Sequence, residues 1–419
     1  MKEKQLLASI LILALILRIV FALIVPVFEK PDEDSHFEYI KFVAENNKLP
    51  VQEAGNLRAE FFQPPFYHVL ASFFFKFISL FTDEMVNQVI LLRFLSIIVS
   101  MFTLYVIYKI AKLLFKNNNL IFGILAFAAF LPSHINMNST VTNANFGDLL
   151  STLIIYFALR IIEGKDKEKI ILILGLIAGL ALITRLSILP AILTIPFIFL
   201  IKYYPKIKPN IKNIIKPLII IGIIALVISG WHLLRNFTLY GDFLGINAMK
   251  LASLPDDITV NPIFIARLLG WTFITFWATF GRTNGIFLGN LESTTGITIF
   301  AISYLALLII TLAAIYGLYI FYKKFRKNKN LLTSLQKKSF IMFIIFLALL
   351  GFSFISFNLY DFQPQGRLFY PTISIISILF TFGIFSITKQ SNWEKFFKYY
   401  LAFFIVLNIA SIINILYFY

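Results

Sequence analysis

A cluster of ionisable side chains stands directly after the first long apolar segment of the chain. Residues 29–50 read EKPDEDSHFEYIKFVAENNKLP. The carboxylates of Asp32 and Glu33 have the chemistry of a general base, and His36 beside them can contact a polar substrate. The proline and acids are also typical of a helix start, and apolar residues then recur at helical spacing. The pattern predicts an amphipathic helix at 32–46 on a membrane surface, with helix capping alone as the competing explanation for its acids.

Four further polar clusters stand at the ends of apolar segments, at 60–68, 139–150, 231–242 and 361–371. Together with Arg93 they supply the remaining candidate side chains, Gln63, Asp148, Arg235, Gln365 and Arg367. Carboxylates, guanidinium groups and amides above an apolar bundle suit a lipid-phosphate substrate. Arg367 is the first choice for the phosphate because a guanidinium binds phosphate oxygens in a bidentate way. Anchoring to lipid headgroups is the alternative for such boundary arginines, and Gln63 is a sugar contact or part of a proline turn.

The composition excludes a soluble globular chain. Hydrophobic residues make up 59% of the 419 residues, charged residues 14%, and the mean hydropathy is +0.84. A bilayer-spanning helix needs about 20 apolar residues, and the runs present predict an all-α polytopic membrane protein with about eleven transmembrane helices. The predicted spans are 5–27, 92–115, 119–136, 147–162, 169–185, 187–204, 217–236, 298–322, 339–358, 370–387 and 399–417. Cysteine is absent, which excludes disulfides and thiolate ligands.

Charge along the chain predicts the side of the membrane that each connection faces. With these spans, most of the 37 lysines and arginines share the side of the N-terminus, which the positive-inside rule assigns to the cytoplasm. The net charge of +16 therefore does not indicate a nucleic-acid partner. The apolar runs 64–81 and 262–280 each begin at proline and contain a cation, so we expect both to lie in the interface or re-enter. The polar clusters then share the outer face of the plasma membrane with two large external loops, 28–91 and 237–297.

The order of four segments carries a family resemblance. They are PDEDSHFEYIKFVAENNKLP, QPPFYHVLASFFF, LLRFLSIIVSMFTLYVIYKIAKLLF and NANFGDLLSTLIIYFALR. Together they resemble the N-terminal half of GT-C integral membrane glycosyltransferases. The nearest branch is that of dolichyl-phosphate-mannose protein mannosyltransferases and aminoarabinose lipid A transferases, which is glycosyltransferase family 39-like. The resemblance covers residues 1–190 and implies a single transmembrane glycosyltransferase domain over 1–419, in which 191–419 supply the C-terminal helices.

This resemblance implies inverting transfer of a sugar from a polyprenyl-phosphate donor to a hydroxyl of a protein, lipid or glycan acceptor on the outer side of the membrane. Asp32 matches the family's catalytic first-loop acid, and Glu33 is the alternate. Relatives begin their fourth span with Asn-Asp-Asn, whereas this chain has Ala144 in the middle position. Asp148 lies one helical turn further on and returns a carboxylate to the same face, with a place in the first helical turn as the competing explanation. The displacement leaves the use of a divalent metal open, although zinc is disfavoured without cysteine or closely spaced histidines.

Two other functions remain open at this point. A lipid-linked glycan ligase or polymerase has a similar bundle and takes a pyrophosphate-linked oligosaccharide instead. A lipid or small-molecule transporter is the second alternative, but transporters place ionisable residues near the middle of spans and break their helices there. The predicted spans hold almost no such residues apart from Arg18 and residues at span boundaries, which favours chemistry at one surface.

Overall fold

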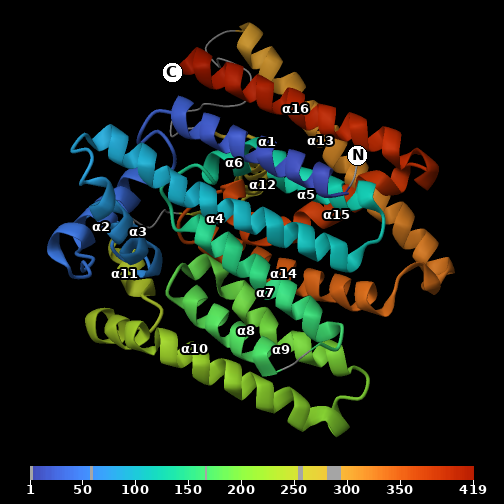
Figure 1. Ribbon diagram of the computed structural model, residues 1–419, viewed down its shortest axis with the longest axis horizontal. Coiled ribbons are helices and arrows are strands. Elements are labelled where there is room, and N and C mark those ends of the chain that lie inside the picture. The colour runs from blue at the N-terminus through green and yellow to red at the C-terminus, as the bar shows by residue number, and fades with distance from the viewer. Residues whose placement is uncertain (1–2, 57–59, 166–167, 253–257, 281–293) are drawn as a thin grey trace.

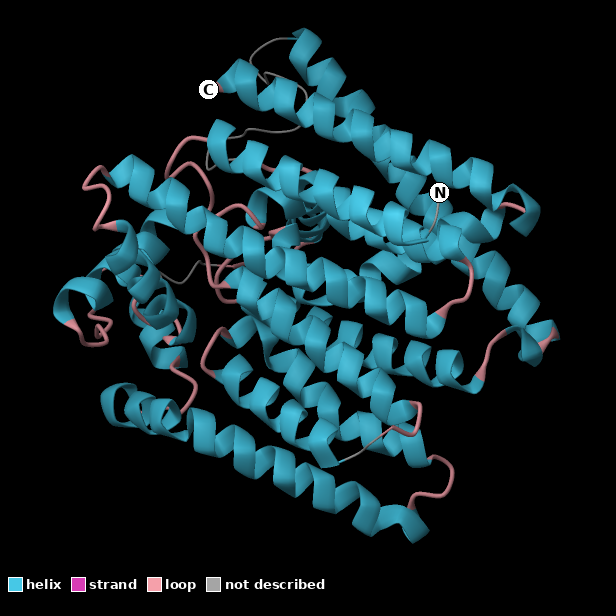
Figure 2. Cartoon of the chain, in the orientation of Figure 1, coloured by secondary structure: helices cyan, strands magenta, loops and turns pink. Residues whose placement is uncertain are grey.

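The computed structural model describes residues 3–56, 60–165, 168–252, 258–280 and 294–419. Within these ranges the chain consists of helices and loops, with no β-strand element (Figure 2). The longer helices are α1 (Glu3–Ile24), α4 (Met85–Leu114), α7 (Ala144–Ile162), α10 (Ile211–Tyr240), α13 (Thr294–Lys327), α14 (Ser334–Asn358) and α16 (Trp393–Phe418). The shorter helices are α2 (Glu33–Asn46), α3 (Phe66–Ile78), α5 (Asn118–Phe130), α6 (Pro132–Met137), α8 (Glu168–Leu182), α9 (Leu189–Tyr203), α11 (Ile246–Ala252), α12 (Pro262–Trp277) and α15 (Ile373–Ile387). Two short 3₁₀ turns matter below, η1 (Leu186–Ile188) before α9 and η4 (Gly366–Thr372) before α15.

The long helices characterise a multi-pass membrane protein. Nine helical stretches in the described part of the chain are long and apolar enough to cross a membrane. The spans predicted at 119–136 and 169–185 form α5 and α8, which have only 13 and 15 residues, so the predicted number of eleven is not confirmed. The runs 64–81 and 262–280, which we expected not to cross, form α3 with 13 residues and α12 with 16. The all-α fold class is confirmed.

Small residues allow the helices to pack closely. Gly175 in α8 faces α10, where a Cβ atom on the glycine would lie 2.9 Å from Ile224. Gly383 in α15 faces α13, where a Cβ atom would lie 2.2 Å from the carbonyl oxygen of Ala314. Lipid tails solvate apolar side chains as well as another helix does, so close van der Waals packing is what holds such helices together. The glycines therefore help to build a rigid frame for the loops at its ends.

The helices of the loop predicted at 28–91 gather at one end of this frame, together with one helix of the loop predicted at 237–297. α2, α3 and α11 lie together at the left of Figure 1, and the lysine-rich connections from α9 to α10 and from α13 to α14 lie at the opposite end. α2 packs on α3 through a small core of its own that includes Phe37 and Tyr67. The amphipathic helix predicted at 32–46 is therefore present. Its polar side is not simply solvated, because Glu33 and His36 are both buried.

Candidate active site

Asp32 stands where the chain enters α2, in a left-handed backbone conformation with φ 59° and ψ 10°. An aspartate at a helix start usually accepts a hydrogen bond from the first helical N–H groups, but the Asp32 side chain makes no such bond. Its Oδ2 instead accepts a hydrogen bond from Nη2 of Arg367 at 2.5 Å, and the two side chains are 36% and 11% exposed. Helix capping therefore does not explain Asp32, whose uncommon backbone conformation accompanies a carboxylate aimed at a distant arginine.

The turn that carries Arg367 is held in place by α12. η4 packs so tightly there that a Cβ atom on Gly366 would lie 2.3 Å from the backbone nitrogen of Phe276. The Gly366 N–H donates to the Thr275 hydroxyl at 2.7 Å. Nε of Arg367 donates to the side-chain carbonyl of Gln365, which was predicted as a substrate ligand. Gln365 thus orients the guanidinium group, and the glycine before Arg367 is required by the close approach of two backbones.

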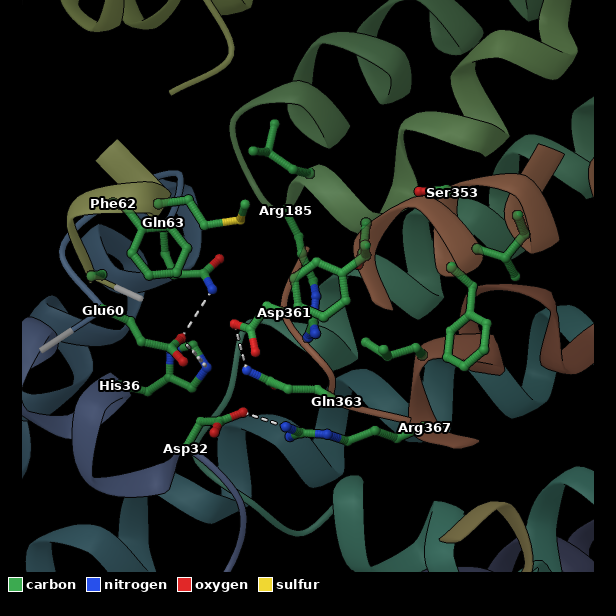
Figure 3. A pocket seen from close by; sticks show the side chains of 18 residues that line it. Asp32, His36, Glu60, Phe62, Gln63, Arg185, Ser353, Asp361, Gln363 and Arg367 are labelled. Carbon is green, nitrogen blue, oxygen red and sulfur yellow. Dashed lines mark hydrogen bonds and ion pairs between the residues drawn. The ribbon is translucent and has the colours of Figure 1, made fainter. Parts of the chain in front are cut away.

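The ion pair borders a cavity of about 350 Å³ (Figure 3). His36 and Gln63, both predicted ligands, lie on its polar wall. Its apolar wall includes one face of α14, with lining residues at the helical positions i, i+3, i+4 and i+7: Leu350, Ser353, Phe354 and Phe357. A cavity with charged groups at one end and an apolar helix face at the other suits an amphiphilic ligand.

A second guanidinium group, on Arg185, faces the same cavity and was not expected from the sequence. Arg185 lies between α8 and η1, and its Nη1 donates to the side-chain carbonyl of Asn143 at 3.3 Å. Burial and the positive charge of Arg367 lower the pKa of Arg185 below its ordinary value. Two cations that repel one another beside a cavity favour the binding of an anion. The sequence feature that could have indicated Arg185 is its position at the predicted outer end of the span 169–185.

Glu60 is a further ionisable cavity residue that was not singled out, although it opens the cluster at 60–68. Its side chain is 24% exposed and lines the polar wall. Nε2 of Gln63 donates a hydrogen bond to Oε2 of Glu60 at 2.9 Å. Burial and the nearby charge of Asp32 raise the pKa of Glu60 to about 8, which favours the protonated form of this carboxyl group at neutral pH.

Glu33 and Arg93, predicted as the alternate base and a phosphate ligand, lie away from the cavity. They form an ion pair of 2.6 Å in which neither side chain is exposed. Glu33 also accepts a hydrogen bond from the Val141 N–H at 3.1 Å, and Arg93 donates to the carbonyl oxygens of Val25 at 2.8 Å and Pro26 at 3.0 Å. The pair therefore joins the end of α1 to α2 and α4, which is a structural task.

Asp148 and Arg235 occupy two further positions. Asp148 is buried in α7 and lines a small pocket that it shares with Arg185, Arg367 and Tyr370, next to the main cavity. Arg235 in α10 donates to the carbonyl oxygen of Pro50 at 2.6 Å and does not line the cavity. The structure thus brings Asp148 close to the site and places Arg235 in α10, where it binds the loop that follows α2.

The residues that the structure describes do not fit a divalent metal site. In the described ranges, no three His, Asp or Glu side chains converge as a metal ion requires. Of the acids near the cavity, Asp32 is bound by Arg367, and Asp148 shares its pocket with two arginines. Glu60 and Asp361 accept hydrogen bonds from the side-chain amides of Gln63 and Gln363. Arginine side chains therefore lie beside Asp32 and Asp148 where a bound metal ion would have to lie.

Residues 63–233 match the family described as dolichyl-phosphate-mannose-protein mannosyltransferase. The match covers less than half of the chain and includes Gln63 and Arg185, whereas Asp32 and Arg367 lie outside it. No curated protein sequence matches the chain significantly. The resemblance that the four motifs indicated is confirmed by this match together with the fold.

Solved structures with the same fold are oligosaccharyltransferases of Archaeoglobus fulgidus. A complex with Zn and sulfate is 12% identical with a TM-score of 0.54, and the match covers 97% of this chain and 53% of that one. AglB in complex with an inhibitory peptide and a dolichol-phosphate is 12% identical with a TM-score of 0.53, over 98% of this chain and 55% of that one. The chain spans about half the length of these proteins, and at such low identity the likeness concerns the GT-C fold alone.

Proposed function

We propose that this protein is a membrane glycosyltransferase that moves one sugar from a polyprenyl-phosphate donor to an acceptor hydroxyl, with inversion at the anomeric carbon. The observation that carries the proposal is the Asp32–Arg367 pair, which stands where two cavities meet. The family match and the fold support a glycosyltransferase with a lipid-phosphate-linked donor. The distribution of lysine and arginine supports a cytoplasmic N-terminus and a site on the outer face of the plasma membrane.

The larger cavity has the features of a donor site. Arg367 and Arg185 offer two guanidinium groups to a phosphate, and the apolar face of α14 continues from them toward the membrane-spanning part of that helix. A volume of about 350 Å³ is at the lower end of ligand pockets and suits one sugar ring with its phosphate. This size supports a single sugar on a monophosphate over a long oligosaccharide on a pyrophosphate.

A second cavity of about 290 Å³ lies on the other side of the ion pair and has the features of an acceptor site. Besides Asp32 and Arg367, its polar lining consists of Ser133, Thr275, Thr279 and Gln365. Displacement with inversion needs the acceptor and the leaving group on opposite faces of the anomeric carbon. Two cavities that share Asp32 allow this arrangement, with the donor in one and the acceptor in the other.

In the proposed reaction the acceptor oxygen attacks the anomeric carbon as the bond from that carbon to the phosphate oxygen breaks. Asp32 takes the hydroxyl proton, and the electron pair of the broken bond leaves on the polyprenyl phosphate. Phosphate oxygens compete with Asp32 for the Arg367 guanidinium, so donor binding frees the carboxylate to act as a base. General-base catalysis of this kind contributes about 10²–10⁴ in rate, and the arginines stabilise the charge of the leaving group.

The test is transfer and hydrolysis of radiolabelled donors by the purified protein in lipid nanodiscs. Polyprenyl-phosphate sugars are expected to be turned over by the wild type and not by Asp32→Asn. Glu38→Gln removes an exposed acid from the same helix and serves as the matched control, with activity expected to equal that of the wild type.

Two further assays separate the alternatives. Turnover of a pyrophosphate-linked oligosaccharide, with none of the monophosphate donors, would identify a ligase. Flux of the lipid donor across proteoliposomes without any cleaved sugar would identify a transporter. Either result, or turnover that persists in Asp32→Asn, contradicts the proposed function.

A further inference from the structure

Two buried histidines between α2 and α3 form a chain of contacts that ends beside Glu60. Nδ1 of His36 lies 2.9 Å from Nε2 of His68, and Nδ1 of His68 lies 3.3 Å from the carbonyl oxygen of Pro64. His36 is 2% exposed and His68 is not exposed at all. Tyr39 stacks on the His68 ring, with 3.9 Å between the ring centroids. Packing therefore fixes both rings in position.

The Pro64 carbonyl sets the tautomers of both rings. A carbonyl oxygen can only accept, so His68 carries its proton on Nδ1. Burial holds the pKa of His68 well below its usual value, which keeps this ring neutral and its Nε2 an acceptor. His36 must then donate from Nδ1. Burial and the charges of Arg185 and Arg367 lower the pKa of His36 to about 3, so its Nε2 has no proton.

The outer nitrogen of His36 is therefore a hydrogen-bond acceptor at the cavity wall. Nε2 lies 3.2 Å from Oγ1 of Thr142 and 4.0 Å from Oε2 of Glu60. Oγ1 of Thr142 already accepts a hydrogen bond from the Ala144 N–H at 3.2 Å, so its own proton can point to His36. The neutral His36 ring therefore brings no positive charge that would favour the carboxylate form of Glu60.

A second chain of hydrogen bonds orients Glu60 from the other side. Nδ2 of Asn143 donates to the carbonyl oxygen of Thr184 at 3.1 Å and to Oε1 of Gln63 at 3.0 Å. The Thr184 carbonyl thereby fixes the amide orientation of Asn143, and Asn143 fixes that of Gln63. Nε2 of Gln63 is left to donate to Oε2 of Glu60. Oε1 of Glu60 is then the oxygen that carries the proton.

We propose that Glu60, oriented by these two chains in a buried site beside Asp32, is an un-ionised carboxyl group that donates a hydrogen bond from Oε1 to a hydroxyl or ring oxygen of the bound sugar. The inference rests on the proposed function and identifies Glu60 as a residue that recognises the sugar of the donor. The groups around Glu60 are Asp32 and neutral His36 on α2, Arg185 before η1 and Arg367 on η4. An ionised Glu60 would repel Asp32 and compete with the donor phosphate for both arginines. An un-ionised Glu60 leaves the arginines to the phosphate.

The pH profile of donor use tests this proposal. Glu60 loses its proton as the pH rises past about 8, so kcat/KM for the donor is expected to fall with one-proton dependence on that alkaline side. Glu60→Gln keeps a donor group that does not titrate. It is expected to stay within about fivefold of the wild type at neutral pH and to lose the alkaline decline, whereas Glu60→Ala loses tenfold or more, on the order of one hydrogen bond to substrate.

Two further variants and a spectroscopic measurement complete the test. Glu53→Gln, an exposed glutamate in the same external loop, is the matched control and is expected to keep the wild-type profile. His68→Phe removes the tautomer lock and retains a ring against Tyr39, and it is expected to move the alkaline decline to lower pH. Infrared difference spectra between neutral and alkaline pH should show a larger loss of protonated-carboxyl absorption in the wild type than in Glu60→Gln.

Three results would overturn the inference: a wild-type profile without an alkaline decline, a decline that persists in Glu60→Gln, or equal losses of protonated-carboxyl absorption in the wild type and Glu60→Gln. Absence of donor turnover in the wild type would contradict the proposed function instead. The infrared measurement needs no substrate, so it still decides whether Glu60 is un-ionised.

Discussion

Two neighbouring acids in this chain are each bonded to an arginine, and their surroundings separate them. The Glu33–Arg93 pair is wholly buried, and the remaining polar atoms of both side chains meet backbone groups. In the Asp32–Arg367 pair, the side chains are 36% and 11% exposed, and cavities lie on both sides. The first pair has no room for another partner, whereas a phosphate can compete for the second. Both pairs join a carboxylate to a guanidinium group, so access decides which acid can react.

The largest effect is expected from breaking the buried pair. Glu33→Gln leaves the Arg93 guanidinium buried without a compensating charge, which costs about 3–5 kcal/mol in unfolding free energy. We expect little folded protein, or a much lower Tm in detergent, measured by intrinsic fluorescence during heating. Arg93→Leu should behave similarly, and Glu38→Gln is the control. A Tm equal to that of the wild type in both variants would show that the buried pair is not structural.

For Asp32 we expect a loss of activity without a loss of stability. Asp32→Asn should keep the wild-type Tm, because a partly exposed pair contributes only about 0–1 kcal/mol, and should lose about 10²–10⁴ in sugar transfer. Radiolabelled transfer and thermal unfolding on the same preparation measure both quantities. Equal losses of stability in Asp32→Asn and Glu33→Gln would remove the distinction between the two pairs.

A smaller loss of transfer activity is expected from a substitution that displaces Arg367 but leaves its side chain in place. Gly366→Ala places a Cβ against the Phe276 backbone and must shift η4. A displacement of about 1 Å can cost up to about 10² in rate, with an accompanying rise in KM for the donor. Steady-state kinetics should show this, and Gly351→Ala is the control because a Cβ there meets no other atom within 4 Å. Unchanged kinetics in Gly366→Ala would mean that the turn adapts without moving the guanidinium.

The smallest effect is expected at Arg235, which holds the loop through the Pro50 carbonyl and does not line the cavity. Arg235→Ala should lower the unfolding free energy by about 1 kcal/mol, the value of one hydrogen bond, and leave donor KM unchanged. Thermal unfolding and donor titration provide the two readings. A large rise in donor KM would return Arg235 to the set of phosphate ligands.

Much of the helical architecture was predictable because a membrane imposes a simple rule on sequence. Apolar runs of sufficient length must be helices, and the two runs interrupted by Lys76 and Arg267 became the short helices α3 and α12. The helices α5 and α8 did not reach spanning length, since they end at turns within or near the predicted runs. Sidedness and domain extent stay predictions.

The candidate site was predictable only in its polar clusters. Asp32, Gln63, His36 and Arg367 were each marked by type and by position at the end of an apolar run, and all four line one cavity. Glu33 and Arg93 carried the same marks and lie elsewhere. Arg185 and Glu60 gave no separate signal, because a single boundary arginine or a loop glutamate is common in any membrane protein.

The sequence by itself determined that the chain is a helical membrane protein, which polar segments stand at the ends of its helices, and which family its motifs resemble. Only the tertiary structure decided which acid meets which arginine, because Asp32 and Arg367 are 335 residues apart and one backbone turn at Asp32 separates its carboxylate from that of Glu33. It also decided the environment of Glu60, since burial and the charge of Asp32 at the start of α2 raise the pKa of that carboxyl group. Local patterns encode helices, whereas accessibility and electrostatic environment arise from packing between segments that no local pattern relates.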